Sequence, residues 1–257
     1  MKIFESHAHY DDNQFDQDRE ELLDEIKKEG ITKLVSAGYS KEGSIKTIEL
    51  SQKYDFIYST VGISPNDIEE NYLEDIEEIE RLIQQKNKKI IAVGEIGLDY
   101  HYDTDKNMQK DAFIKQIQIA NKYNLPIVIH TRDAVMDTIQ ILKENPVNKK
   151  GVFHCCPFNR ELVKEALKLG FYISFSGTVT FKNSKNAEEI VKMVPNDRFL
   201  IETDSPYLSP EPNRGKRNDS RNLKYIIKKI AIFKEKTEEE IAELSYNNAM
   251  NIFNIEE

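Results

Sequence analysis

The chain has 257 residues, with 36 lysines and arginines against 45 aspartates and glutamates, so its formal net charge is −9. This acidic balance excludes an affinity for nucleic acid that rests on overall charge, and any phosphate-binding site must be local. The two cysteines, Cys155 and Cys156, are adjacent, which excludes a disulfide scaffold. No apolar run approaches about 20 residues and the N-terminus lacks a signal-peptide pattern, so we expect no membrane contact. The cysteine usage indicates a reducing interior, so we expect a cytoplasmic protein, and no pattern indicates an obligate protein partner.

Short apolar, β-branched runs recur along the chain, and charged segments with helical periodicity separate them. The predicted strands are, in chain order, Lys2–Ser6, Ile31–Ala37, Phe56–Ile63, Lys89–Ile96, Pro126–His130, Gly151–Cys155, Phe171–Ser176 and Phe199–Thr203. Strands that alternate with helices in this way are typical of an α/β fold, the (β/α)8 TIM-like barrel, and we predict that a single such domain spans residues 1–257. A doubly wound open sheet is the alternative. It usually carries a glycine-rich loop after its first strand, where this chain has His7-Ala8-His9.

The segments between and after the strands predict amphipathic helices with recognisable ends. Asp16–Glu29 and Asn159–Leu169 each carry an apolar stripe and are each followed by a glycine, the usual residue after a helix. Asp105–Asn124 has a similar stripe. The tail Asp219–Phe253 predicts two further helices, and Thr237 has a glutamate three residues later, as in a capping box.

Histidines gather at one predicted end of the barrel. The chain has five, and four of them stand at the carboxyl ends of predicted strands: His7, His9, His130 and His154. Barrel enzymes build their active sites at that end. Since residues i and i+2 of a strand share a face, His7 and His9 are both expected to point into the barrel mouth, an arrangement that Zn²⁺ and similar ions accept.

Carboxylates complete a candidate metal centre. By the same rule Glu202 and Asp204 share a face at the end of the last strand, which a closed barrel places beside the first strand. Glu95 ends the fourth strand. The candidate ligands are then His7, His9, Glu95, His130, His154 and Asp204. Because this set exceeds the ligands of one tetrahedral ion, we expect two divalent metal cations, Zn²⁺, Mn²⁺ or Mg²⁺, that share a bridging carboxylate.

The chain resembles the TatD family of metal-dependent deoxyribonucleases, within the amidohydrolase-like barrels. The motifs that carry the resemblance occur in family order over essentially the whole chain: Ser6–Asp11, Gly94–Tyr100, Pro126–Asp133, Gly151–Cys155, Ile201–Leu208 and Asn213–Asn218. The resemblance implies a TIM-like barrel, one or two divalent cations and hydrolysis of phosphodiesters, often as a 3′→5′ exonuclease.

The resemblance also implies roles for individual residues. It gives two ligand sets that share one carboxylate: His7, His9, Glu95 and Asp204 for one cation, and Glu95, His130 and His154 for the other. Glu95 would be the bridge between the two cations. Our own hypothesis adds that Asp204 is the base that takes a proton from a metal-activated water, so that Glu95 and Asp204 are the catalytic residues. Glu202 would not bind a cation itself but would contact one of the ligands and orient it.

The chain departs from the family pattern in three places. The family usually has Gly-x-His-Pro-His after the third strand, where this chain has Ser64 and Asn66 in place of the two histidines. His154 is followed by Cys155-Cys156-Pro157 instead of a turn of small residues, and Glu5 replaces the common aspartate. These departures concern substrate contacts more than the metal ligands.

Four cations near the predicted barrel mouth are candidate contacts for substrate phosphate. Arg214, Lys216 and Arg217 lie in a loop after the last strand, and Arg132 shares a face with His130. Arginine suits phosphate because its guanidinium binds two oxygens at once. The alternatives are a solvated loop cluster for the first three and an ion pair to a barrel carboxylate for Arg132.

Three functions fit these residues. The first is a phosphodiesterase that acts on DNA, with the 3′ oxygen as the leaving group. The second is an amidohydrolase, or an aminoacyl-ester hydrolase acting on charged tRNA, with the same centre acting on a carbonyl. The third is a metal-binding scaffold protein without catalysis. The phosphate-binding cations favour the first, although tRNA also bears phosphate.

Overall fold

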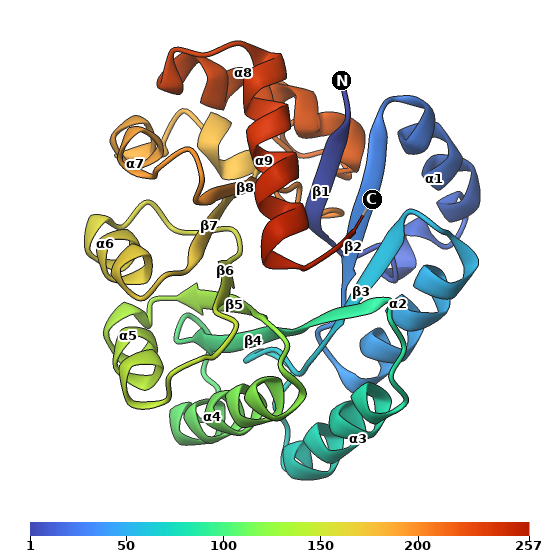
Figure 1. The fold of residues 1–257 in the computed structure, drawn as a ribbon, viewed down its shortest axis with the longest axis vertical. Helices are drawn as coiled ribbons and strands as arrows, with labels where there is room; N and C mark the ends of the chain where they lie inside the picture. Colours follow the sequence, from blue (N-terminus) through green and yellow to red (C-terminus); the bar gives the residue numbers. More distant parts are fainter. Residues whose placement is uncertain (257) are drawn as a thin grey trace.

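The computed structural model describes residues 1–256 and consists of one parallel sheet whose strands alternate with helices (Figure 1). The strands are β1 (Ile3–Ala8), β2 (Ile31–Ala37), β3 (Ile57–Val61), β4 (Ile90–Asp99), β5 (Ile127–Arg132), β6 (Gly151–Phe153), β7 (Tyr172–Phe175) and β8 (Phe199–Ile201). The helices are α1 (Arg19–Lys28), α2 (Lys41–Lys53), α3 (Tyr72–Gln84), α4 (Lys106–Tyr123), α5 (Val135–Glu144), α6 (Arg160–Lys168), α7 (Ala187–Met193), α8 (Leu223–Lys234) and α9 (Glu238–Ile252). Within residues 1–256, no helix is both long and apolar enough to cross a membrane.

The sheet curls into a barrel that closes between its first and last strands. Strand order follows chain order from β1 to β8, and each strand pairs in parallel with the next. Beyond the end of β8, the Asp204 N–H donates to His7 O at 3.0 Å, and the His9 N–H donates to Ser205 O at 2.7 Å. The (β/α)8 barrel is therefore confirmed, because a doubly wound sheet would reverse its strand order partway along the chain.

Helix α9 covers the N-terminal end of the barrel. The strands send apolar side chains into the barrel near their starts, among them Phe4, Val128 and Leu200, and these pack in one cluster with residues of α9. The Phe4 ring lies 5.9 Å from the ring of Tyr246 and 6.1 Å from that of Phe253, measured between centroids. In Figure 1, α9 lies against β1 and β8. The opposite end, where the strands finish, is left to the loops that build the site.

The predicted elements are present, with shifted boundaries at several strands. Strand β4 continues to Asp99, beyond the predicted end at Ile96, whereas β6 ends at Phe153 and β8 ends at Ile201. The prediction placed Glu202 and Asp204 on one face of the last strand, and this was wrong, because the strand ends at Ile201. The two residues follow the strand, and Asp204 adopts the left-handed conformation with φ of 59°, so strand alternation does not apply to them.

The capping box at the start of α9 is confirmed, since the Thr237 side chain accepts from the Glu240 N–H and the Glu240 side chain accepts from the Thr237 N–H. Replacing the cap, as Thr237→Ala, should lower the free energy of unfolding by about 1 kcal/mol, because an N–H of the first turn loses its partner. For a chain of this size that is a fall in Tm of about 2–4 °C. Thermal unfolding measures it, with Glu243→Ala at an exposed position of α9 as control. Equal Tm values for the two variants would contradict the role of the cap.

Candidate metal centre

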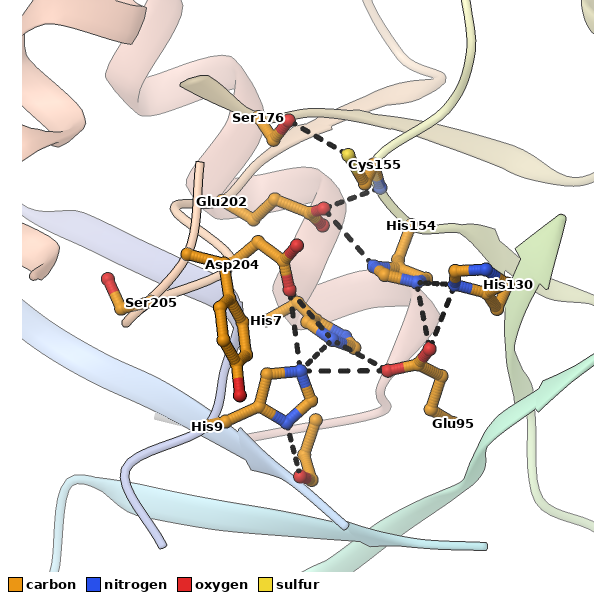
Figure 2. A network of polar contacts seen from close by, with 12 residues as sticks. His7, His9, Glu95, His130, His154, Cys155, Ser176, Glu202, Asp204 and Ser205 are labelled. Atoms are coloured by element: carbon orange, nitrogen blue, oxygen red, sulfur yellow. Dashed lines mark hydrogen bonds and ion pairs between the residues drawn. The ribbon is translucent and has the colours of Figure 1, made fainter. Parts of the chain in front are cut away.

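The six predicted ligands converge at the carboxyl ends of five strands (Figure 2). His7 and His9 come from the end of β1, Glu95 from β4, His130 from β5, and His154 and Asp204 from the residues just after β6 and β8. All but His130 are buried. Among the described residues, the side chains that could hold a metal form three overlapping groups: His7 with His9 and Glu95, His7 with His154 and Asp204, and Glu95 with His130 and His154.

The first ligand set surrounds a point with near-tetrahedral spacing. His7 Nε2 and His9 Nε2 lie 3.2 Å apart. Glu95 Oε2 lies 3.4 Å from His7 Nε2 and 3.6 Å from His9 Nε2. Asp204 Oδ1 lies 3.7 and 3.4 Å from the same two nitrogens. Ligands at about 2.1 Å from a tetrahedral ion lie about 3.4 Å from one another, so His7, His9 and Glu95 are spaced as ligands of one divalent cation, and Asp204 has the same spacing from the two histidines.

The second ligand set uses the other oxygen of Glu95. Glu95 Oε1 lies 2.9 Å from His130 Nδ1 and 3.3 Å from His154 Nε2, and the two nitrogens lie 3.1 Å apart. Three such atoms form one face of a coordination sphere and leave positions for a substrate or water, as in catalytic metal sites. Because Glu95 Oε2 faces the first set, the two oxygens of this carboxylate face different ligand groups and could bridge two cations.

A glycine lets β4 and β5 approach each other beside Glu95. Gly97 pairs with His130 in the register of the two strands and has φ of 143°, a conformation that favours glycine. A Cβ atom at this position would lie 2.0 Å from the backbone oxygen of His130. Any larger residue would therefore clash with the His130 backbone and force the two strands apart there.

Further contacts orient the histidine rings. The second nitrogen of His9 lies 3.0 Å from Ala37 O, and that of His130 lies 3.0 Å from Asp99 Oδ2. His154 Nδ1 lies 3.5 Å from Glu202 Oε1, which also accepts from the Cys155 N–H. Partners of this kind select the ring nitrogen that faces a metal. The contact of Glu202 fits its predicted role, whereas the role of Asp99 was not predicted. The sequence could have indicated this role, because Asp99 follows Glu95 by four residues in the same strand and residues at that spacing share a face.

The pKa values show that the centre holds charge of both signs. Burial alone would raise the pKa of Glu95, but His154 and hydrogen bonds from the surrounding histidines hold it well below its usual value. The pKa of Asp204 is also lowered, because the contacts with His9 and His154 outweigh burial. Burial lowers the pKa of His7, whereas the carboxylates overcome burial at His9 and raise its pKa to about 9. Because histidine binds a metal only in its neutral form, cation binding to the histidines whose pKa is raised should release protons.

Glu5 holds the segment that carries Asp204. Its two carboxylate oxygens accept from the N–H and the hydroxyl of Thr203, at 2.8 and 2.6 Å. Asn218 ties the same segment from the other side, because its amide donates to Thr203 O and Tyr207 O. Burial raises the pKa of Glu5 to about 8. The departure from aspartate at this position therefore serves a structural contact beneath the site.

A cavity of about 660 Å³ opens beside the ligands. His130, His154 and Asp204 line it, and aromatic side chains contribute to its wall: Tyr102, Phe158, Phe181 and Tyr207. Cys155 and Cys156 also line it. Burial raises the pKa of both thiols, so neither is poised as a nucleophile.

The four candidate phosphate contacts do not lie together. Arg132 lines the cavity, with its guanidinium 5.6 Å from the centre of the Tyr102 ring. Arg214 stacks on the Phe181 ring of the cavity wall at 3.7 Å. Arg217 instead pairs with Asp18 through both nitrogens, and Lys216 lines a different pocket beside it. The structure therefore places Arg132 in the cavity lining and Arg214 against a ring of its wall, whereas Lys216 and Arg217 line another pocket, where the Asp18 carboxylate holds Arg217.

The residues that replace the family's two histidines form a turn after β3. The Ser64 hydroxyl donates to Asp67 Oδ2 at 2.6 Å, and the Asn66 amide donates to Asp99 Oδ2 at 3.2 Å. Neither residue lines the cavity beside the metal ligands. Asn66 is thus linked to the carboxylate that contacts His130.

A parallel barrel with two clustered ligand sets at its carboxyl end defines the class of metal-dependent hydrolase barrels. The chain belongs to the TatD family: the family described as "TatD related DNase" matches residues 4–254. It is 43% identical to the "uncharacterized metal-dependent hydrolase YabD" of Bacillus subtilis, over 98% of this chain and 99% of that protein. It is 35% identical to "uncharacterized metal-dependent hydrolase YcfH" of Escherichia coli, over 100% of this chain and 97% of that protein.

Solved structures show the same fold. The crystal structure of YjjV, a TatD homologue from Escherichia coli, superposes with a TM-score of 0.94 at 24% sequence identity and covers 99% of this chain and 98% of that one. The TatD family protein of Entamoeba histolytica superposes with a TM-score of 0.86 at 24% identity, over 98% of both chains.

Proposed function

We propose that the protein hydrolyses phosphodiester bonds of DNA with two divalent cations and releases nucleotides from the 3′ end. The observation that carries this proposal is the pair of ligand sets joined by Glu95, which borders a cavity that also contains Arg132. Two metal positions that share a bridge are suited to in-line displacement at phosphorus. The description of the family as DNases supports the same substrate.

The donor atoms fit Zn²⁺ or Mn²⁺ through their imidazoles, and the carboxylates also accept Mg²⁺. When bound, such ions supply Lewis acidity to the phosphoryl group and lower the pKa of water. The chain's own residues then complete the reaction. Arg132 holds a phosphate oxygen, and the aromatic wall of the cavity takes the neighbouring nucleoside and excludes bulk water. Asp204 accepts the proton of the attacking water, because its lowered pKa keeps it ionised at neutral pH.

The position of Asp204 suits both binding and proton transfer. Its Oδ1 atom faces His7 and His9 in the first ligand set, while the residue also lines the cavity. One carboxylate oxygen can therefore face a cation while the other receives a proton. As the oxygen of the attacking water bonds to phosphorus, the bond from phosphorus to the 3′ oxygen of the neighbouring nucleotide breaks. The terminal nucleotide leaves with its 5′ phosphate, and the 3′ oxygen of the shortened strand takes a proton from solvent to become a hydroxyl.

The alternative is a hydrolase that acts on a carbonyl, either an amidohydrolase or an enzyme that cleaves the aminoacyl ester of charged tRNA. Arg132 favours a phosphate-bearing substrate: within residues 1–256 its guanidinium contacts the Tyr102 ring and forms no ion pair with a carboxylate. The predicted alternative of a barrel salt bridge for Arg132 is therefore not seen in the described structure. A non-catalytic scaffold would not need a cavity beside the ligands.

The experiment that separates these functions compares substrates under one set of conditions. Metal-reconstituted protein is incubated with end-labelled single- and double-stranded DNA, charged tRNA, and a panel of small esters and amides. We expect metal-dependent turnover of DNA and little turnover of esters. Turnover of charged tRNA or amides without turnover of DNA would favour the carbonyl hydrolase, and saturating metal without any turnover would favour the scaffold.

Arg132 and Arg214 should carry the electrostatic part of DNA binding. Arg132→Ala and Arg214→Ala should each raise KM for DNA and lower the slope of log affinity against log salt by about one, as expected for the loss of one phosphate contact. Arg217→Ala and Lys216→Ala are matched controls, because these cations line a different pocket, whereas Arg132 lines the cavity and Arg214 stacks on Phe181 of its wall. Steady-state kinetics at several salt concentrations measure both quantities. Larger effects in the two controls than in the two test variants would contradict this assignment.

A further inference from the structure

A chain of side-chain contacts links an exposed loop residue to the second ligand set. Asn66 Nδ2 donates to Asp99 Oδ2 at 3.2 Å, and the same oxygen lies 3.0 Å from His130 Nε2. His130 Nδ1, the other ring nitrogen, faces Glu95 Oε1 at 2.9 Å. Because an imidazole that donates from Nε2 presents the lone pair of Nδ1, Asp99 selects the form of His130 that can bind a cation.

The carboxylate of Asp99 is held from every side that the structure describes. Its Oδ1 atom accepts from the His101 N–H at 2.9 Å. Gln109 brackets its backbone, because the amide oxygen accepts from Asp99 N and the amide nitrogen donates to Asp99 O. Asp99 is 1% exposed, so these partners stand where water would otherwise contact its oxygens. Asn66 supplies the remaining donor, on the oxygen that contacts His130.

The turn that contains Asn66 is held by contacts that do not involve the Asn66 side chain. The Asn66 N–H donates to the Ser64 hydroxyl, which in turn donates to Asp67, and the Ser64 N–H donates to Tyr39 O. The turn therefore forms without the Asn66 amide. A substitution that changes only this amide can alter the contact with Asp99 and leave the turn in place.

We propose that Asn66 is a positioning residue for the second cation, acting through Asp99 on His130. With two acceptor contacts on Oδ2, the Asp99 carboxylate cannot rotate away from the ring, and His130 Nδ1 stays aimed at the position beside Glu95. The inference rests on the two-cation centre proposed above and adds the residue that fixes one of its ligands. The role needs a side-chain N–H donor at this position, which the asparagine amide supplies.

The test measures cation affinity and not turnover, so that it is independent of the substrate. Metal-stripped protein is titrated with Zn²⁺ against a chromophoric chelator, and the second ion is defined as the one whose binding His130→Ala removes. Asn66→Asp keeps the shape of the side chain but replaces the donor by a carboxylate that repels Asp99. We expect the affinity for the second ion to fall about tenfold, the lower end of the loss seen when a partner of a metal ligand is removed. The affinity for the first ion should stay within about twofold.

Asn71→Asp is the matched control. Asn71 donates from Nδ2 to Asp75 Oδ2 at 3.3 Å, the same pair of groups at a similar distance, in a contact at the start of α3 that does not involve the ligands. Asn66→His, which retains an N–H donor, should recover much of the affinity. In the Asp99→Asn background, Asn66→Asp should have no further effect, because the two residues act in one chain.

The outcomes separate the two proposals. If His130→Ala removes no ion, the two-cation centre is wrong, and this inference falls with it. If His130→Ala removes an ion but Asn66→Asp binds it as Asn71→Asp does, only the role of Asn66 is wrong. Additive losses in the double variant with Asp99→Asn would likewise overturn the proposed route through Asp99.

Discussion

Asp204→Asn should retain most of its cation and DNA binding and lose kcat by at least about a hundredfold, because removal of a general base typically costs about 10²–10⁴ in rate. The amide keeps the size of the side chain and one oxygen donor but accepts a proton very poorly. Asparagine also tolerates the left-handed backbone at this position, where φ is 59°. Single-turnover kinetics on a labelled oligonucleotide, with metal content measured on the same sample, check the prediction.

Asp133→Asn is the matched control for this variant. Asp133 also lines the cavity and also has a left-handed backbone, with φ of 54°, but its carboxylate faces His101 and contacts none of the ligands. The control removes the same charge from the same cavity and should change kcat by less than about threefold, as expected for an exposed group outside the transition state. A fall of less than about tenfold in Asp204→Asn, with full metal occupancy, would leave Asp204 as a ligand only and place the base elsewhere.

Loss of the second cation should abolish turnover without unfolding the barrel. Chelation removes both ions, whereas His130→Ala removes one ligand of the set that contains Glu95 Oε1 and His154 Nε2. Since His130 is the least buried of the ligands, the core should tolerate its truncation. We expect His130→Ala to bind one ion fewer, to keep the circular dichroism spectrum of the barrel, and to lose DNA hydrolysis by at least about a thousandfold, the scale of a major electrostatic contribution to catalysis.

The exposed His101 provides the corresponding control, because it lies near the mouth of the barrel and outside the three candidate groups. His101→Ala should bind both ions and retain its activity. Full hydrolysis by the metal-stripped protein would contradict the metal-dependent mechanism, and full activity of His130→Ala would show that one ion is enough.

The fold was predictable because strands buried on both faces appear as apolar runs and each is followed by an amphipathic helix. The convergence of the ligands was predictable from the same order: residues that follow parallel strands meet at one end of a barrel. His7 and His9 show this most clearly, since two residues at i and i+2 were enough to place both rings in the mouth.

Other parts of the site depend on geometry that local sequence does not encode. Asp204 reaches the first ligand set through a left-handed residue beyond β8, not through strand alternation, as the prediction assumed. Arg217 pairs with Asp18, about 200 positions earlier in the chain, a contact that only the closed barrel creates. Strand alternation could have placed Asp99 on the same face as Glu95. Its contact with His130, however, depends on the register between β4 and β5, in which Asp99 pairs with Arg132.

The most direct test of the two-cation phosphodiesterase is to return ions to the metal-stripped protein one equivalent at a time and to follow hydrolysis of an end-labelled DNA strand. The geometry of the two ligand sets predicts little cleavage with the first equivalent and rapid release of 3′-terminal nucleotides as the second equivalent binds beside Glu95. Cleavage that is complete without added ions, or two bound equivalents without cleavage of any DNA strand, would contradict it.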